Sequence, residues 1–169
     1  MSFRYISSVI EKNVEIGDNT NIWYFSHLCD GVRVGNDCSI GQGVYLGPGV
    51  ILGDNVRISN GVNIYPGTII KNDVWIGNNT SFTNVRTQSV VKRPTSGKKG
   101  KISYTIIENG ASIGANVTVV AGVRVGVSAV VADGSVVVDN IPDGSWANGN
   151  PAHVKSAYQS INKIYKNQK

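Results

Sequence analysis

Large apolar side chains recur at every sixth position along the first half of the chain. The thirteen positions of this ladder are Ile10, Ile16, Ile22, Leu28, Val34, Ile40, Leu46, Leu52, Ile58, Ile64, Ile70, Ile76 and Phe82. An α-helix would need a period near 3.6 residues, and an ordinary strand meander would need a period of two between longer, irregular turns. A strict period of six fits neither pattern and indicates an internal repeat.

Two other positions of each six-residue unit are also restricted. The residue two places before each rung is small or β-branched, as in Val14, Thr20 and Val32. A glycine or another turn-forming residue follows most rungs, and such residues tolerate the left-handed backbone that tight corners need. Each unit is therefore predicted to form one short strand and one corner. Three units make one triangular coil, stacked roughly 4.8 Å from the next, which is the architecture of a hexapeptide-repeat parallel β-helix.

The ladder stops after Val85 and resumes in the same rhythm at Ile107, Ile113, Val119, Val125, Val131 and Val137. The intervening residues 86–104 are predicted to form one protruding loop. A loop of this length in an otherwise economical repeat is more often functional or disordered than structural filler.

The insertion is basic. It holds no acidic residue, and its cationic residues are Arg86, Lys92, Arg93, Lys98, Lys99 and Lys101. Three interpretations stay open: a binding loop for a phosphorylated ligand through Arg86 and Arg93, a merely solvated loop, and a nucleic-acid contact. The last is disfavoured, because the basic run lacks interleaved aromatic residues for stacking and no recognised nucleic-acid fold is present.

The end of the chain carries signals for a helix. Asn150 and Pro151 read as a cap and a first-turn proline, and the apolar residues after them have helical spacing. We expect one β-helix domain over residues 1–152 and a short C-terminal α-helix and tail over 153–169. Nothing resembles a signal peptide or a membrane span, so we expect a cytoplasmic protein without membrane insertion.

The two cysteines, Cys29 and Cys38, occupy different places in the repeat. They lack metal-ligand spacing, so we expect reduced structural thiols and no metal.

Residues eighteen apart lie above one another in the predicted stack. One face carries a column of His27, Tyr45, Asn63 and Ser81 and, two residues later in each coil, a column of Cys29, Gly47, Tyr65 and Thr83. The neighbouring corner carries a column of Tyr24, Gln42, Asn60 and Asn78. These polar columns converge on one edge of the predicted solenoid, and we expect Gln42, Asn60, Asn63 and Tyr65 to bind a ligand there. The alternative for each asparagine is a corner residue that satisfies backbone groups. On the third face, outward Ile51 and Ile69 suggest contact with another subunit.

The ladder resembles that of the left-handed β-helix acyltransferases. Four segments resemble the subfamily that N-acetylates 3-amino sugars on nucleotide carriers: Asn21–His27, Ile40–Gln42, Phe82–Val85 before the basic insertion, and Gly149–Ala152. The match runs over most of the chain. In that subfamily the donor is acetyl-CoA, the protein is a homotrimer, and the active sites lie between neighbouring subunits.

The resemblance also implies roles for individual residues. Asn84 would lie at the reacting centre, with His27, Gln42 and Asn60 near the acceptor. Backbone groups around Ala121, Ala129, Ala132 and Gly134 would line the pantetheine arm of acetyl-CoA. Pro151 and Lys155 would flank its adenine end.

Acyl transfer from a thioester needs a neutral nucleophile, a site for the developing oxyanion and an exit for the proton. An amine with a pKa of roughly 8 is already partly neutral, so no strong protein base is required. We expect Asn84 to orient the amine, backbone N–H groups to hold the carbonyl oxygen and the leaving sulfur to take the proton, with His27 as the fallback base.

Three rival functions differ in what they require. A sugar O-acetyltransferase on the same fold would need a positioned base such as His27. A β-helix carbonic anhydrase would need several histidines, and only His27 and His153 exist. A non-catalytic solenoid scaffold would need no basic insertion.

Overall fold

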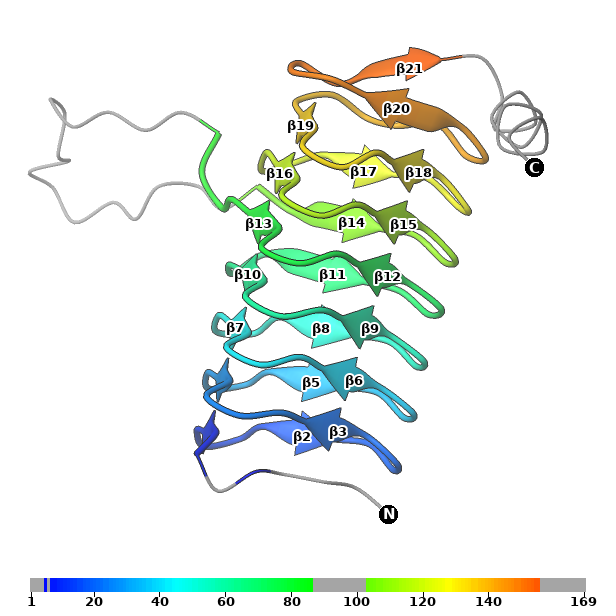
Figure 1. The fold of residues 1–169 in the computed structure, drawn as a ribbon. Coiled ribbons are helices and arrows are strands. Elements are labelled where there is room, and N and C mark those ends of the chain that lie inside the picture. The colour runs from blue at the N-terminus through cyan, green and yellow to red at the C-terminus, as the bar shows by residue number, and fades with distance from the viewer. Residues whose placement is uncertain (1–4, 6, 87–102, 156–169) are drawn as a thin grey trace, which may run out of the picture.

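A computed structural model describes residue 5, residues 7–86 and residues 103–155. It confirms the predicted all-β fold, a left-handed parallel β-helix of hexapeptide repeats. The described strands stack in successive coils from β1 at one end to β21 at the other (Figure 1). Each coil is triangular because its three short strands belong to three different sheets.

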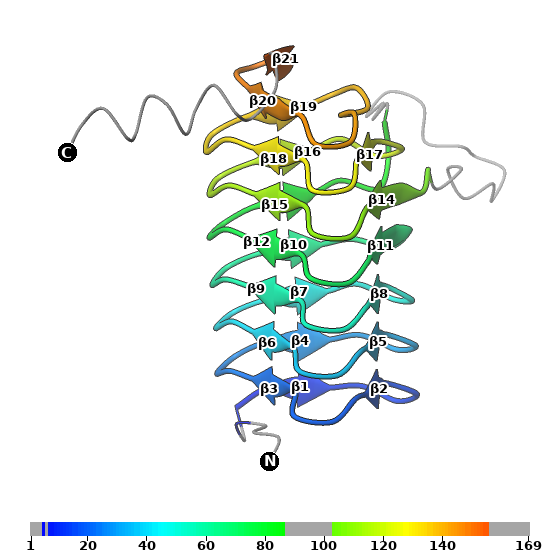
Figure 2. The ribbon, with the colours of Figure 1, turned by 90° about the vertical axis from the view of Figure 1, so that its right-hand side faces the viewer.

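The three sheets run along the whole stack (Figure 2). Sheet 1 contains β1 (Val9–Ile10), β4 (His27–Leu28), β7 (Tyr45–Leu46), β10 (Asn63–Ile64), β13 (Ser81–Phe82), β16 (Thr118–Val119) and β19 (Val136–Val137). Sheet 2 contains β2 (Glu15–Ile16), β5 (Arg33–Val34), β8 (Ile51–Leu52), β11 (Thr68–Ile70), β14 (Thr105–Ile107) and β17 (Arg124–Val125). Sheet 3 contains β3 (Asn21–Ile22), β6 (Ser39–Ile40), β9 (Arg57–Ile58), β12 (Trp75–Ile76), β15 (Ser112–Ile113), β18 (Val130–Val131), β20 (Trp146–Asn148) and β21 (His153–Lys155).

Strand register follows the sequence repeat. Val9 pairs with His27 and His27 with Tyr45, so neighbouring coils are offset by eighteen residues. Across the insertion the offset grows to thirty-seven, since Ser81 pairs with Thr118. The strand pairing of the solenoid therefore continues from the coil before the insertion to the coil after it, and the described residues next to the gap are Arg86 and Ser103.

The core is the stack of rungs. Ile22, Leu46, Ile64 and Phe82 are fully buried, and the polar positions two places before a rung are buried as well, as at Thr20. The hydroxyl of Thr20 donates to the carbonyl of Gly35 at 2.8 Å. A buried hydroxyl is thus satisfied by the corner of the next coil, which explains why small β-branched polar residues fit this inward position.

Asparagine and aspartate side chains stitch the corners together. At the corner between sheets 2 and 3, Asn36 Oδ1 accepts from the backbone N–H of Asp18 at 2.8 Å, and Asp54 Oδ1 accepts from that of Asn36 at 2.7 Å. The pattern continues with Asn72 Oδ1, which accepts from the N–H of Asp54 at 3.0 Å. These side chains satisfy backbone donors that no strand partner reaches.

The predicted C-terminal helix is not found over residues 150–155. Residues 149–152 form a turn, and β21 pairs antiparallel with β20, with Ala147 opposite Val154. Gly149 has a φ of 102°, a conformation that favours glycine and a chain reversal rather than a helix start. The N–H of Ala152 donates to Val136 at 2.8 Å and ties this turn to the last coil. The remainder of the predicted helix, residues 156–169, lies outside the described residues.

Among the residues that the structure describes, none belongs to a helix able to span a bilayer.

Candidate functional site

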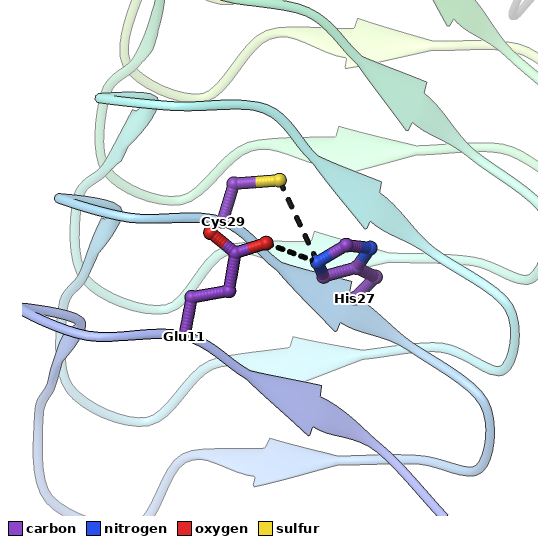
Figure 3. A group of neighbouring side chains, drawn as sticks. All are labelled: Glu11, His27 and Cys29. Carbon is purple, nitrogen blue, oxygen red and sulfur yellow. Dashed lines mark hydrogen bonds and ion pairs between the residues drawn. The ribbon is translucent and has the colours of Figure 1, made fainter.

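Glu11, His27 and Cys29 form a side-chain cluster on the first two coils (Figure 3). The cluster arises from the repeat, because Glu11 follows β1 and Cys29 occupies the same position one coil later, after β4. Glu11 Oε1 lies 2.6 Å from His27 Nε2, and Cys29 Sγ lies 3.8 Å from the same nitrogen. The second carboxylate oxygen, Oε2, accepts from the backbone N–H of Asp30 at 2.9 Å. The carboxylate is therefore held from both sides.

These contacts set the charge state of the cluster. The hydrogen bond with His27, reinforced by the N–H of Asp30, lowers the pKa of Glu11 below its usual value of 4.5. Interaction with Cys29, followed by burial, raises the pKa of Tyr45 to about 12. Glu11 is thus an anion and Tyr45 a neutral phenol at neutral pH. The Tyr45 ring meets His27 edge-on at 5.6 Å and Tyr65 at 5.4 Å, which continues the cluster along sheet 1.

Sequence reasoning missed Glu11, although the spacing that locates it was available. Cys29 lies eighteen residues after Glu11, which is one coil, so the two side chains stack. The same reasoning had already grouped His27 and Cys29 on one face. Glu11 is the first member of the column that continues with Cys29, Gly47 and Tyr65.

Asn84 lies at the corner where sheet 1 gives way to the insertion, and it is half-buried. The preceding Thr83 accepts a hydrogen bond from the N–H of Ala121 at 2.9 Å, which anchors this corner to the next coil. Beyond it, Arg86 donates to the carbonyl of Val138 at 3.1 Å and lies 3.7 Å from Asp139 Oδ1. Arg86 is therefore an exposed arginine that fastens the start of the insertion to the later coils.

His27 and Asn84 do not meet within one chain. Their strands, β4 and β13, are three places apart in sheet 1. Neighbouring strands lie about 4.8 Å apart, so the two positions are separated by roughly 14 Å along the stack. Within one subunit, a group that His27 touches cannot also contact Asn84 without spanning this distance.

The predicted acceptor residues fall into two places. Gln42 and Asn60 line a shallow hollow of about 430 Å³ at the corner between sheets 3 and 1, with Trp23, Ser39, Gly41, Arg57, Ile58, Ser59 and Asn78. Asn60 is also a corner residue of the structural kind, since its Oδ1 accepts from the N–H of Gln42 at 2.9 Å. Asn63 and Tyr65 lie instead on and after β10, where Asn63 donates to the carbonyl of Gly61 at 3.1 Å. Arg93 lies outside the described residues.

The four residues expected along the pantetheine arm lie at three different corners. Ala121 shares the corner of Asn84, Ala129 is buried at the corner between sheets 2 and 3, and Ala132 and Gly134 lie at the corner between sheets 3 and 1. All four backbone N–H groups already donate within the chain, to Thr83, Gly126, Ala147 and Ala115 respectively. A ligand could use only their carbonyl groups or their surfaces.

Pro151 and Lys155 lie at the C-terminal end of the stack. Pro151 is in the turn that joins β20 and β21, and Lys155 pairs with Trp146 across that hairpin. Both are exposed, in a turn and on a strand respectively rather than in the helix that the sequence predicted.

Family comparisons agree with this repeat architecture. The sequence matches the bacterial transferase hexapeptide family (six repeats) over residues 31–66 and the hexapeptide repeat of succinyl-transferase over residues 9–48 and 104–138. Together these matches cover more than half of the chain. The protein belongs to the hexapeptide-repeat family of bacterial transferases.

One curated relative matches part of the chain at higher identity. A stretch of 51 residues is 55% identical to part of dTDP-3-amino-3,6-dideoxy-alpha-D-galactopyranose 3-N-acetyltransferase from Aneurinibacillus thermoaerophilus, covering 30% of this chain and 27% of the relative. The matched stretch spans less than a third of the length of the curated relatives.

Two solved structures share the fold. The hexapeptide-repeat acetyltransferase VCA0836 of Vibrio cholerae, solved with acetyl coenzyme A, is 26% identical with a TM-score of 0.58, over 70% of this chain and 69% of that one. A galactoside acetyltransferase in complex with coenzyme A is 20% identical with a TM-score of 0.66, over 89% of this chain and 68% of that one. The second similarity concerns the fold alone.

Proposed function

We propose that the protein is an acetyl-CoA-dependent N-acetyltransferase that acts on the 3-amino group of a sugar carried on UDP or dTDP. The observation that carries the proposal is the 55% identity to a dTDP-linked 3-amino-sugar 3-N-acetyltransferase. The similarity to an acetyltransferase solved with acetyl coenzyme A supports the choice of donor. The product would be a building block for a surface polysaccharide, made in the cytoplasm.

The reaction would join the sugar nitrogen to the acetyl carbon. The amine lone pair attacks the thioester carbonyl, the C–S bond breaks as the tetrahedral intermediate collapses, and the departing sulfur takes the proton that nitrogen loses. An amine with a pKa near 8 needs no strong base. Because the N–H groups of Ala121, Ala129, Ala132 and Gly134 are engaged, the Asn84 carboxamide is the better donor for the carbonyl oxygen as well as the group that orients the amine.

We place the reacting centre at the corner of Asn84, where Thr83 and Ala121 connect two coils. The positive charges of Arg86 and Arg93, both in the basic insertion, would attract the diphosphate of the carrier. The other predicted site residues lie on earlier coils: His27, Gln42, Asn60, Asn63 and Tyr65. They would therefore bind a part of the acceptor far from its amine, or act in the site of a neighbouring subunit.

A homotrimer with sites between subunits would bring such separated residues together. An apolar surface suits an interface: a hollow of about 230 Å³ is lined by Pro48, Gly49, Ile51, Pro66, Gly67, Thr68, Ile69 and Tyr104. Ile51 is 38% exposed and Tyr104 is 69% exposed. Light scattering coupled to size-exclusion chromatography would give three chain masses; a monomer would contradict the shared-site arrangement.

The test of the function measures thiol release from acetyl-CoA with purified protein and a panel of nucleotide-linked 3-amino sugars and their 3-hydroxy counterparts. We expect turnover with an amine. Asn84→Ala should lower kcat by about 100-fold or more, the usual loss for one oxyanion donor. Asn84→Asp keeps the size and an acceptor but loses both N–H donors, and should be similarly impaired. Near-normal turnover by both variants, with unchanged melting, would remove Asn84 from the reacting centre.

A sugar O-acetyltransferase is the second candidate, and the Glu11–His27 hydrogen bond favours it. A hydroxyl nucleophile needs a base that a third group orients, and Glu11 orients His27 at 2.6 Å. Nε2 faces Glu11, so Nδ1 would have to accept the proton. Turnover confined to the 3-hydroxy members of the panel would select this function, whereas turnover confined to the amines would exclude it.

A further inference from the structure

Three side chains of the first two coils direct metal-binding atoms toward one another (Figure 3). One carboxylate oxygen of Glu11, one ring nitrogen of His27 and Cys29 Sγ all lie within 4.8 Å of one another. A carboxylate, an imidazole and a thiolate are the donor types that zinc takes in proteins. We propose that Glu11, His27 and Cys29 form a binding site for one zinc ion or a similar borderline transition-metal dication.

The arrangement suits a shared metal better than a proton relay. In a nucleophile–histidine–acid triad, the imidazole uses one nitrogen for the nucleophile and the other for the acid. Here Glu11 at 2.6 Å and Cys29 at 3.8 Å both approach Nε2. Two groups at the same ring nitrogen cannot exchange a proton through the ring, but they can surround a common ion.

The distances are close to those of a tetrahedral site. Zinc bonds of about 2.0 Å to nitrogen and 2.3 Å to sulfur place those two atoms about 3.5 Å apart at a tetrahedral angle, compared with the present 3.8 Å. The Glu11 oxygen must move from 2.6 Å to a little over 3 Å from Nε2. The Glu11 side chain is 39% exposed, so packed neighbours do not enclose it. The ion replaces the proton that Glu11 and His27 share, and Nδ1 carries the imidazole hydrogen.

The surroundings support the ligands. The N–H of Asp30 holds the second oxygen of Glu11 at 2.9 Å, which orients the carboxylate as an outer-shell partner does. The Glu11 carboxylate and a Cys29 thiolate supply two negative charges that balance a dication. Cys29 is only 5% exposed, whereas His27 and Glu11 are partly open to solvent. A fourth coordination position therefore faces water, as in zinc sites with three protein ligands.

Such an ion would join the first coil to the second. Glu11 belongs to the coil of β1, while His27 lies on β4 and Cys29 directly follows it, and β1 is the outermost strand of sheet 1. In a solenoid each coil contacts only its neighbours, so the terminal coil has the fewest partners. Binding to the folded state alone would raise the melting temperature as metal is added.

The test uses the full chain with reduced thiols, titrated with Co²⁺ as a spectroscopic substitute for zinc. We expect one equivalent per chain, a thiolate-to-cobalt charge-transfer band in the near ultraviolet, and loss of that band on adding Zn²⁺ but not Mg²⁺, because this donor set does not suit a hard cation. Cys29→Ser should abolish the band. The matched control is Cys38→Ser, which removes the other free, buried thiol and should leave the band intact.

Glu11→Gln provides a second variant on a partly exposed residue, where misfolding is not expected. Loss of this ligand should weaken zinc binding by at least about tenfold and remove the metal-dependent rise in melting temperature. Absence of the band in the native chain, its survival in Cys29→Ser, or unchanged zinc affinity in Glu11→Gln would each overturn the proposed site.

Discussion

Phe25 occupies a corner position whose backbone conformation is unfavourable for phenylalanine, and replacing it should stabilise the protein. Its φ is 59°, in the left-handed region. The equivalent positions of other coils, one coil apart, hold glycine or asparagine: Gly43, Gly61, Asn79, Asn116 and Gly134. These residues adopt left-handed backbone at low cost, whereas a bulky side chain is strained there. The predicted substitution is Phe25→Asn.

The magnitude follows from two opposing contributions. A left-handed conformation costs most L-residues about 1–2 kcal/mol, and asparagine much less. The residue Phe25 is 66% exposed; at about 1.5–3 kcal/mol for a fully buried side chain, its covered third contributes about 0.5–1 kcal/mol. We therefore expect a net gain of about 0.5–1 kcal/mol, or about 1–4 °C in melting temperature for a chain of this length.

Thermal and urea unfolding of the native chain and Phe25→Asn would measure this gain. The matched control is the reverse change at an equivalent exposed corner, Asn116→Phe, where φ is 54°; it should lose about 1 kcal/mol. A loss of stability in Phe25→Asn, with Asn116→Phe unchanged, would refute the reasoning and show that contacts of the Phe25 ring outweigh its backbone strain. A stabilised variant with lower turnover would indicate that the strain is kept for function.

Two further predictions concern the corners. Gly53→Ala would place a Cβ against Asn72 Oδ1 and 2.9 Å from the Lys71 carbonyl carbon, which would disrupt the hydrogen bond between Asn72 and the N–H of Asp54. We expect urea unfolding to show a loss of about 2–4 kcal/mol in the free energy of unfolding. The control, Gly43→Ala, has a φ of 66° but meets nothing within 4 Å, so it should lose only about 1 kcal/mol, and equal losses would contradict the packing argument. Asp143 accepts a hydrogen bond from the N–H of Val127 and a second from the Arg124 side chain, and these contacts, the first being the larger, lower the pKa of Asp143 below its usual 3.8. The charge of Asp143 therefore stabilises the fold above pH 3.8. This contribution disappears as the pH falls through the lowered pKa. The difference in urea midpoint between the native chain and Asp143→Asn should shrink below pH 3.8, and a constant difference down to pH 2 would contradict the assignment.

The sequence repeat was sufficient to predict strand register. Because each coil before the insertion has eighteen residues, pairing Val9 with His27 follows from counting alone. Burial of the rungs follows too, since a residue that points inward in one coil has its equivalents stacked above it. The insertion could be placed for the same reason: the rhythm resumes at Ile107, which pairs back onto Ile70.

The predicted helix start at Asn150 and Pro151 was wrong because helix signals are local, whereas the observed pairing depends on the place of β20 at the end of sheet 3. Asn150 and Pro151 are acceptable at a helix start. Here, however, the end of sheet 3 offers an unpaired edge at β20, and residues 153–155 pair with it. Covering an exposed strand edge is a tertiary advantage that no window of sequence around Pro151 reveals.

The candidate site was only partly predictable, because eighteen-residue spacing says which side chains stack but not which atoms meet. It grouped His27 with Cys29, yet the contact of both with Glu11 depends on side-chain rotamers. It also placed Asn60 in a polar column, where its oxygen serves the backbone of Gln42. A corner asparagine has the same sequence signal whether it serves the backbone or a ligand.

The two groups of candidate functional residues lie at different heights along the axis of the β-helix. The Glu11–His27–Cys29 cluster lies on the first two coils, while Asn84 lies roughly 14 Å further along the stack, beside the contact between Thr83 and Ala121. Coils contact only their neighbours, so a change in one cluster reaches the other through at least two intervening coils of packed core. A single chain can therefore carry both groups independently, and any direct cooperation between His27 and Asn84 requires a second subunit to bring the two ends together.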